Sequence, residues 1–283
     1  MITATTQPIS KGQYYVTLND LVNTYHYWGD DDGDGQGGQV TATGHLEALF
    51  FDKYLNSINP SDALTLCRAP YYLDYNSVED ITLTTQYGVP NSLNVDWNEA
   101  YYYFNPAPSA TLCHTKPTAT YSSSWWPHWD NYTDGFRGYL IQSTNPASYG
   151  LNFPTTGMDG YAFDLDIRGV DASQLTWQPV THSGITATVS WTKTSSRDKY
   201  PSGKRPEYVT RVTLTGPKPS YSQIQSNNPS PLSKPTLPQT FELVGRDSAG
   251  NALITYGFEL KQWFVRGTAY NVRFTLSEAT TWL

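Results

Sequence analysis

Apolar and polar residues alternate with a period of two along much of the chain after residue 160, which is the pattern of strands with one buried face. Turns rich in glycine, serine, lysine and proline separate the alternating stretches. Strands at this spacing predict an Ig-like β-sandwich, which we place at residues 161–257. The predicted strands are 161–167, 175–177, 185–191, 208–214, 241–245 and 252–256.

Residues 1–160 have a different pattern, in which short aromatic stretches alternate with turns. They predict an irregular β-rich domain, so the expected fold class is all-β. One segment departs from this pattern: apolar residues recur with a helical period from Leu46 to Ile58, with Gly44 before them and Asn59 and Pro60 after them. We therefore expect one helix over 46–58. The strands expected in this domain are 13–18, 25–28, 40–43, 70–75, 81–87 and 100–104.

The composition supports a β-rich, ordered protein. The 283 residues include 22 Tyr and 9 Trp, and only 15% are charged, whereas disordered chains are poor in aromatic residues. A net charge of −7 argues against a nucleic-acid partner, which would need a basic surface. No apolar run approaches the ~18 residues of a membrane span, so we expect no membrane insertion. The polar start shows no signal peptide, which leaves two interpretations: a cytosolic protein or a piece of a longer exported one. We also expect a monomer.

The most distinctive stretch is acidic and rich in glycine. Asp30, Asp32 and Asp34 alternate and Gly35 follows, which matches the first half of a calcium loop. We predict a calcium ion bound by these three carboxylates and by Gln36. The glutamate that completes an EF-hand is missing, so any remaining ligands would come from elsewhere in the fold. The alternative is an acidic turn in contact with solvent.

The two cysteines lie in similar contexts. Cys67 and Cys113 each follow a Thr-Leu pair and precede a proline. A pair of this kind in a tyrosine-rich chain predicts a disulfide and an oxidising compartment. The alternative is two buried free thiols.

A second cluster is aromatic. Trp125, Trp126 and Trp129 fall within five residues around His128, and hydroxyl side chains and a proline surround them. Such a cluster can bind carbohydrate, because a sugar packs its apolar face on an aromatic ring while polar neighbours bind its hydroxyls. The alternative is that the tryptophans form the core of an irregular module. His128 lies inside the cluster, and we expect it to pack or to form hydrogen bonds rather than to bind a metal.

The end of the chain adds a family resemblance. Residues 241–265 include Gly-Phe-Glu-Leu-Lys-Gln-Trp-Phe-Val at 257–265, and they resemble the closing region of large enterobacterial surface adhesins of the invasin and intimin-like kind. In that family a β-sandwich repeat ends in such a strand, and a small, often lectin-like module follows. Residues 258–283 would then be the terminal strand and the start of a truncated module, with 275–283 as its first helix. The family's usual cysteine after this tryptophan is absent here.

The resemblance implies an exported all-β rod at the cell surface that attaches to host surfaces, with residues 1–160 as its adhesion domain. It implies no ligand-binding residues. The predicted function is therefore attachment to a host glycan or protein, with calcium as a stabilising ion.

An enzyme is the rival class. Asp164 and Asp166 share one strand face, which would suit glycoside hydrolysis. No nucleophile elbow, zinc-protease motif or phosphate loop is present in the sequence, so we expect no catalysis. The alternative function is a carbohydrate-binding module, or another domain, of a secreted glycoside-active enzyme.

Overall fold

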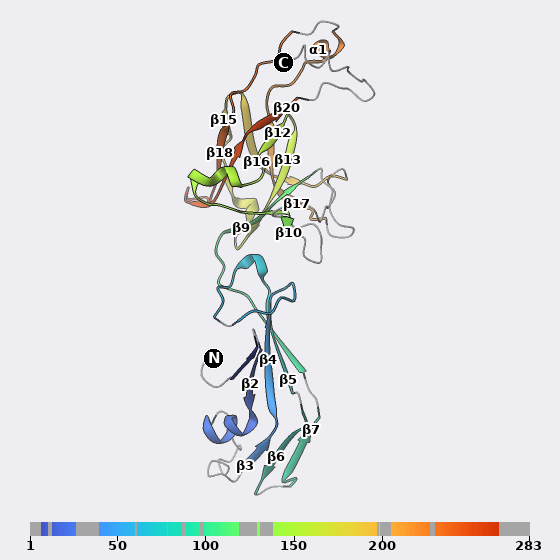
Figure 1. Cartoon of the computed structure of the whole chain (residues 1–283), viewed down its shortest axis with the longest axis vertical. Helices are drawn as coiled ribbons and strands as arrows, with labels where there is room; N and C mark the ends of the chain where they lie inside the picture. The colour runs from blue at the N-terminus through green and yellow to red at the C-terminus, as the bar shows by residue number, and fades with distance from the viewer. Residues whose placement is uncertain are drawn as a thin grey trace. The chain divides into compact units, whose positions relative to one another are not determined.

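The computed structural model divides the chain into two compact units, Met1–Ala107 and Pro108–Leu283. Both are built from antiparallel strands with a few short helical turns, so the predicted all-β class is confirmed (Figure 1). The structure describes residues 7–10, 13–26, 40–59, 61–77, 79–86, 89–96, 99–118, 129–130, 138–196, 198, 205–226 and 230–265.

The first unit contains two antiparallel sheets. The larger has the strand order β1-β2-β4-β5-β8, and the smaller has the order β3-β6-β7. Its strands are β1 (Gln7–Ser10), β2 (Gln13–Thr17), β3 (Val40–Thr43), β4 (His45–Phe51), β5 (Tyr71–Ser77), β6 (Ile81–Thr85), β7 (Ser92–Val95) and β8 (Glu99–Phe104). A π-helical turn η1 (Asp20–Thr24) follows β2, and a 3-10 turn η3 (Leu66–Arg68) precedes β5.

The helix expected over 46–58 is wrong, because its first half is strand β4. β4 lies between β2 and β5, and both neighbours pair with its backbone in antiparallel register. Ala48 and Phe50 are buried in the core beside Tyr71. Leu49 and Phe51 point to the opposite face, so the apolar spacing comes from a strand with apolar residues on both faces. The segment is a strand rather than a helix because β2 and β5 pair with it on both sides.

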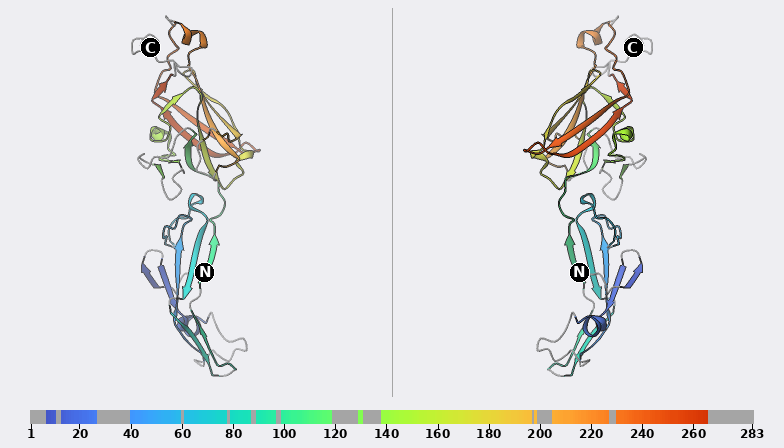
Figure 2. Two further views of the ribbon diagram at one scale, coloured as in Figure 1. Left: turned by 90° about the vertical axis from the view of Figure 1, so that its right-hand side faces the viewer. Right: turned by 90° about the vertical axis from the view of Figure 1, so that its left-hand side faces the viewer.

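The second unit is a β-sandwich (Figures 1 and 2). One sheet has the order β10-β11-β9-β13-β17-β16-β15 and the other has the order β14-β18-β19, while β12 and β20 form a short parallel pair. The strands are β9 (Thr111–Pro117), β10 (Trp129–Asp130), β11 (Gly138–Leu140), β12 (Thr156–Met158), β13 (Tyr161–Arg168), β14 (Thr176–Trp177), β15 (Val180–His182), β16 (Ile185–Lys193), β17 (Tyr208–Thr215), β18 (Gln239–Arg246), β19 (Ala252–Leu260) and β20 (Gln262–Phe264). The helical segments are η4 (Pro146–Leu151), η5 (Ala172–Gln174) and α1 (Tyr221–Gln225).

The sandwich core joins the inner faces of its two sheets. Phe163 and Val212 of the larger sheet pack in one cluster with Phe241 and Phe258 of the smaller one, and all four are fully buried. The rings of Phe241 and Phe258 stack 5.3 Å apart, and Phe163 meets Phe258 edge-on. Burial of this alternating set is the reason for the period-two pattern in the sequence.

The larger sheet also takes strands from before residue 160. β9 pairs with β13, with Leu165 opposite Thr115 and Asp166 opposite His114. The division between the compact units accordingly falls after Ala107. β9 carries buried polar residues and lacks a clear apolar alternation, so its sequence gives little sign of this pairing.

A buried cation stabilises the β13–β17 pair and the loop after β16. The Nε of Arg211 on β17 lies 2.7 Å from Oδ1 of Asp164, and its Nη2 lies 3.0 Å from Oδ2 of Asp198. The backbone N–H of Ser195 also donates to Asp198, over 2.8 Å. The Arg211 side chain is only 14% exposed, so its charge depends on these two carboxylates.

No helix among the described residues is long and apolar enough to cross a membrane.

Candidate functional site

The predicted calcium ligands Asp30, Asp32, Asp34 and Gln36 lie outside the described residues. The flanks of this stretch are described: η1 ends at Thr24 and β3 begins at Val40. The side-chain amide of Asn23 donates to the carbonyl oxygen of Val40 over 3.3 Å. The residues that flank the acidic stretch are thus joined by a hydrogen bond. Within the described ranges, no group of three or more His, Cys, Asp and Glu is placed to hold a metal.

Most of the predicted tryptophan platform also lies outside the described residues. This applies to Trp125, Trp126 and His128. The backbone of Trp129 begins β10 and pairs with that of Tyr139 on β11. The platform therefore stays a prediction.

The predicted disulfide is confirmed. Cys67 in η3 and Cys113 in β9 are bonded to each other, and neither thiol is free. The bond closes a loop that contains β5, β6, β7 and β8.

The carboxylates that suggested an enzyme are both bound by cations. Asp164 pairs with Arg211 as described above. Asp166 lies 2.7 Å from Nε of Arg168 and 3.5 Å from Nδ1 of His114. Burial alone would raise the pKa of Asp166, but His114 and Arg168 outweigh it and hold the pKa well below its usual value. Both carboxylates are thus parts of ion pairs in the sandwich.

A candidate binding surface lies on the larger sheet of the first unit. Its register places Phe51, Tyr72 and Tyr103 in one row across β4, β5 and β8, and places Asp74 opposite Tyr101 in the next row. Directly paired residues share a face of a sheet, so these five side chains form one surface. We call this set the tyrosine face. The opposite face carries the buried core residues of the same strands.

The rings of the tyrosine face contact each other and reach solvent. Phe51 stacks on Tyr72 with ring centres 5.2 Å apart, and Tyr72 lies 5.8 Å from Tyr103 and 6.2 Å from Tyr101. Tyr101 is 49% exposed and Tyr103 is 70% exposed. The hydroxyl of Tyr101 donates to Oε1 of Glu99, and this bond raises the pKa of Tyr101 to about 12. Such a cluster of exposed rings is a candidate binding surface.

Asp74 lies among these rings at a cost in stability. Its Oδ1 is buried and has no hydrogen-bond partner within the described part of the chain. Burial raises the pKa of Asp74 above its ordinary value, and the charge of Glu99 adds to the shift. A carboxylate held in this way favours a role in binding over a role in folding.

The free energy of unfolding of Asp74→Asn at pH 7 should therefore be equal to or higher than that of the parent. A raised pKa means that the folded state binds the proton more tightly, so this carboxylate lowers stability as the pH rises through that pKa. We expect a gain of about 1 kcal/mol at pH 7, because asparagine keeps the shape of the side chain but has no charge to desolvate beside Glu99. The gain should vanish near pH 3, where Asp74 is protonated in both states. Urea unfolding at both pH values measures it, and a loss of stability at pH 7 would show that Asp74 makes a stabilising bond.

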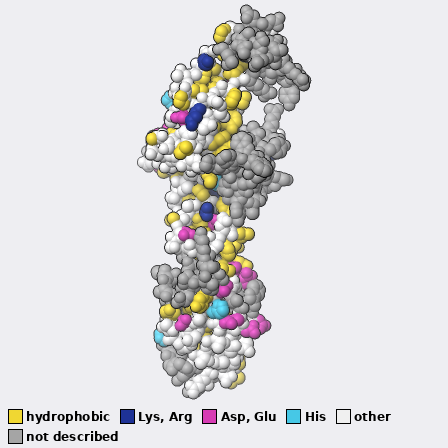
Figure 3. Space-filling view, viewed as in Figure 1, with side chains coloured by type: hydrophobic (Ala, Val, Ile, Leu, Met, Phe, Trp, Pro, Cys, Tyr) yellow, Lys and Arg dark blue, Asp and Glu magenta, His cyan; other side chains and the backbone are white. Residues whose placement is uncertain are grey.

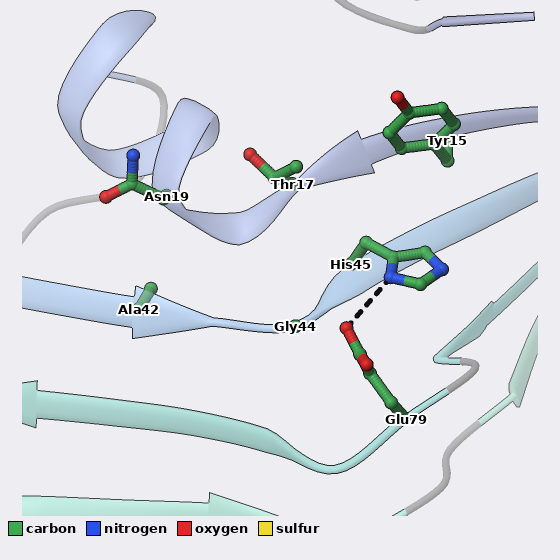
Figure 4. Close-up of a pocket in the computed structure, with 7 residues that line it drawn as sticks. All are labelled: Tyr15, Thr17, Asn19, Ala42, Gly44, His45 and Glu79. Atoms are coloured by element: carbon green, nitrogen blue, oxygen red, sulfur yellow. Dashed lines mark hydrogen bonds and ion pairs between the residues drawn. The ribbon is translucent and has the colours of Figure 1, made fainter.

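A pocket of about 690 Å³ lies at the other end of the same sheet (Figure 4). Tyr15 of β2 and His45 of β4 line it, and their rings meet edge-on with centres 5.9 Å apart. Nδ1 of His45 lies 2.9 Å from Oε1 of Glu79, and Figure 4 shows the two side chains pointing toward each other. The remaining lining residues are Thr17, Asn19, Ala42 and Gly44.

Two turns shape this pocket. Gly44, between β3 and β4, has φ +96°, where a side chain is disfavoured, and its carbonyl accepts the N–H of Leu18 over 3.0 Å. The hydroxyl of Thr17 donates to Oδ2 of Asp20 over 2.6 Å and accepts the N–H of Asp20 over 3.1 Å. These bonds position the start of η1 beside the end of β2.

The surface around these features is acidic. Apart from Glu79, the carboxylates come from the strand positions that share this face: Glu47, Asp74 and Glu99. No Lys or Arg occupies a position on this face of β2, β4, β5 or β8. Figure 3 shows acidic side chains gathered near a histidine on the side of the first unit that faces the viewer.

The sequence contained part of the signal for this site. Stretches 70–75 and 100–104 were predicted as strands, and in both of them aromatic residues fall on both faces. Which tyrosines share an exposed face depends on the pairing register between β5 and β8, and a single strand pattern does not contain that register. The His45–Glu79 pair joins positions 34 residues apart, so no local motif could indicate it.

Comparisons with protein-family models, with curated proteins and with solved structures found no match to this chain. The chemistry of the site follows from its side chains. Exposed rings bind the apolar faces of sugars, and carboxylate and imidazole groups bind hydroxyls.

Proposed function

We propose that this chain is part of a bacterial cell-surface adhesin whose first unit binds a host glycan. The observation that carries the proposal is the tyrosine face, where exposed rings contact each other around Asp74, whose Oδ1 has no hydrogen-bond partner among the described residues. The resemblance of residues 241–265 to surface adhesins and the disulfide, which suits an oxidising compartment, support it. In this proposal the β-sandwich is a spacer.

The proposal retains two features from the sequence. Calcium bound at Asp30, Asp32, Asp34 and Gln36 would stiffen the first unit and lower the ordering cost of ligand binding. The tryptophans at 125, 126 and 129, with His128, would add a second aromatic contact surface.

A carbohydrate-binding module of a secreted glycoside-active enzyme is the second candidate, because the same rings would serve it. The two differ in their target. An adhesin should attach to intact host cells, whereas such a module should prefer an insoluble polysaccharide.

The test is binding of the purified, oxidised chain to host cells and to a glycan array, with calcium and with EDTA. We expect saturable cell binding, a set of bound glycans, and weaker binding in EDTA.

EDTA and Asp32→Ala should each lower the melting temperature, since an ion at 100 times its Kd adds about 2.7 kcal/mol to the stability of the native state. Absence of both cell and glycan binding would refute the adhesin. An unchanged melting temperature in both cases would refute the calcium site alone.

A further inference from the structure

The tyrosine face and the pocket belong to one continuous sheet surface. On β4, Phe51 and His45 point to the same side, and the two positions are six residues apart. At a rise of about 3.4 Å per residue, they are separated by about 20 Å along the strand. Between them, Tyr15, Glu47, Asn76 and Glu99 form one row across the sheet. A linear ligand can therefore lie along this face and reach from Tyr103 to the pocket.

The pocket end offers hydrogen-bond acceptors beside a ring. When His45 is neutral, its Nδ1–H donates to Glu79, which leaves Nε2 as an acceptor. Among the described residues, neither this Nε2 nor Oε2 of Glu79 makes a hydrogen bond. Both atoms belong to residues that line the pocket together with the ring of Tyr15. A sugar ring satisfies this arrangement, because it has hydroxyl donors at its edge and an apolar face for the aromatic ring.

The charge of the surface selects among sugars. Glu47, Asp74, Glu99 and Glu79 surround the proposed path, and the paired strand positions include no cation. Carboxylates accept hydrogen bonds from the hydroxyls of a sugar, but they repel a ligand's sulfate and carboxylate groups. The surface therefore disfavours sialylated and sulfated glycans.

We infer that the tyrosine face and the pocket bind one linear glycan without anionic groups, with its terminal sugar in the pocket that Tyr15, His45 and Glu79 line. This inference rests on the proposed function, because it names the ligand class and the site for the same attachment. The glycan stacks on Tyr101 and Tyr103, and the hydroxyls of its terminal sugar donate to Glu79 and to Nε2 of His45.

The test uses a glycan array that carries neutral glycans and their sialylated and sulfated counterparts, followed by calorimetry with the strongest neutral glycan. We expect signal on neutral glycans, and about tenfold weaker binding for each of Tyr103→Ala and Glu79→Gln. Tyr102→Ala is the matched control: Tyr102 is 60% exposed on the same strand but points to the opposite face. It should bind as the parent does. Glu79→Lys should gain signal on sialylated glycans.

The outcomes separate this inference from the proposed function. Signal confined to anionic glycans, or an equal loss in Tyr102→Ala, would overturn the inference while the adhesin stands. Full binding by both Tyr103→Ala and Glu79→Gln, with loss in Trp125→Ala, would place the ligand on the tryptophan platform and overturn the inference as well. Failure to bind any glycan or cell would refute both. Melting curves of each variant show that it is folded, since Tyr103 and Glu79 are exposed.

Discussion

Replacing Arg211 with methionine should lower the unfolding free energy of the second unit by about 3–5 kcal/mol. The guanidinium lies between two carboxylates that are themselves only 7% and 9% exposed, Asp164 and Asp198. Methionine fills part of the volume but removes the guanidinium that Asp164 and Asp198 share, and breaking a buried ion pair by removing one partner is costly. Urea unfolding followed by tryptophan fluorescence measures the loss.

Lys193→Met is the matched control. Lys193 belongs to the same β16–β17 hairpin, and its Nζ lies 3.2 Å from Oε1 of Glu207, but both side chains are more than 60% exposed. An exposed pair of this kind contributes about 0–1 kcal/mol. If Arg211→Met costs no more than Lys193→Met, the buried network does not stabilise the sandwich.

The same network predicts sensitivity to acid. Burial tends to raise the pKa of Asp198, but the N–H of Ser195 and the guanidinium of Arg211 outweigh it, so the pKa lies below its ordinary value. A lowered pKa gives stability that is present above the ordinary value and is lost as the pH falls toward the folded value. The gap in stability between the parent and Arg211→Met should therefore narrow below about pH 4.

Removing the disulfide should have the second large effect, on the first unit. The Cys67–Cys113 bond closes a loop of 46 residue steps that contains four strands of that unit. In the chain-entropy model a closed loop of this length restricts the unfolded chain by about 4 kcal/mol. The double variant Cys67→Ser, Cys113→Ser should therefore unfold its first unit at much lower urea concentration, while the transition of the second unit moves little.

Reduction of the parent protein provides the control. Dithiothreitol should shift the parent to the transition of the double variant and should leave the variant itself unchanged. A parent that unfolds identically in oxidised and reduced form would show that the bond adds no stability.

The second unit was easier to predict from sequence than the first, for a physical reason. Its long strands bury one face against a facing sheet, so alternation is visible in the stretches 185–191 and 208–214. In the first unit, β4 carries apolar residues on both faces because its outer face is the exposed aromatic surface, and this mixture imitates a helix. The misread segment thus includes Phe51 of the candidate site.

Long-range partners account for the remaining differences. The burial of β9 and the His45–Glu79 pair depend on contacts between segments 34 or more residues apart, and local patterns do not encode such contacts. The disulfide was predictable because two cysteines leave one pairing. The shared face of Tyr72, Tyr101 and Tyr103 was not predictable, because it depends on the pairing register between β5 and β8.

In the proposed adhesin, the disulfide would have a mechanical consequence. Tension applied between the two ends of the chain passes from Cys67 to Cys113 through the sulfur–sulfur bond. The covalent bond thus prevents the segment that contains β5, β6, β7 and β8 from being extended between the chain ends. The 46 residue steps it spans would otherwise extend to about 150–165 Å. Two of these strands, β5 and β8, supply Tyr72, Asp74, Tyr101 and Tyr103, so most of the proposed glycan-binding face lies in the part of the chain that such tension cannot extend while the bond is intact.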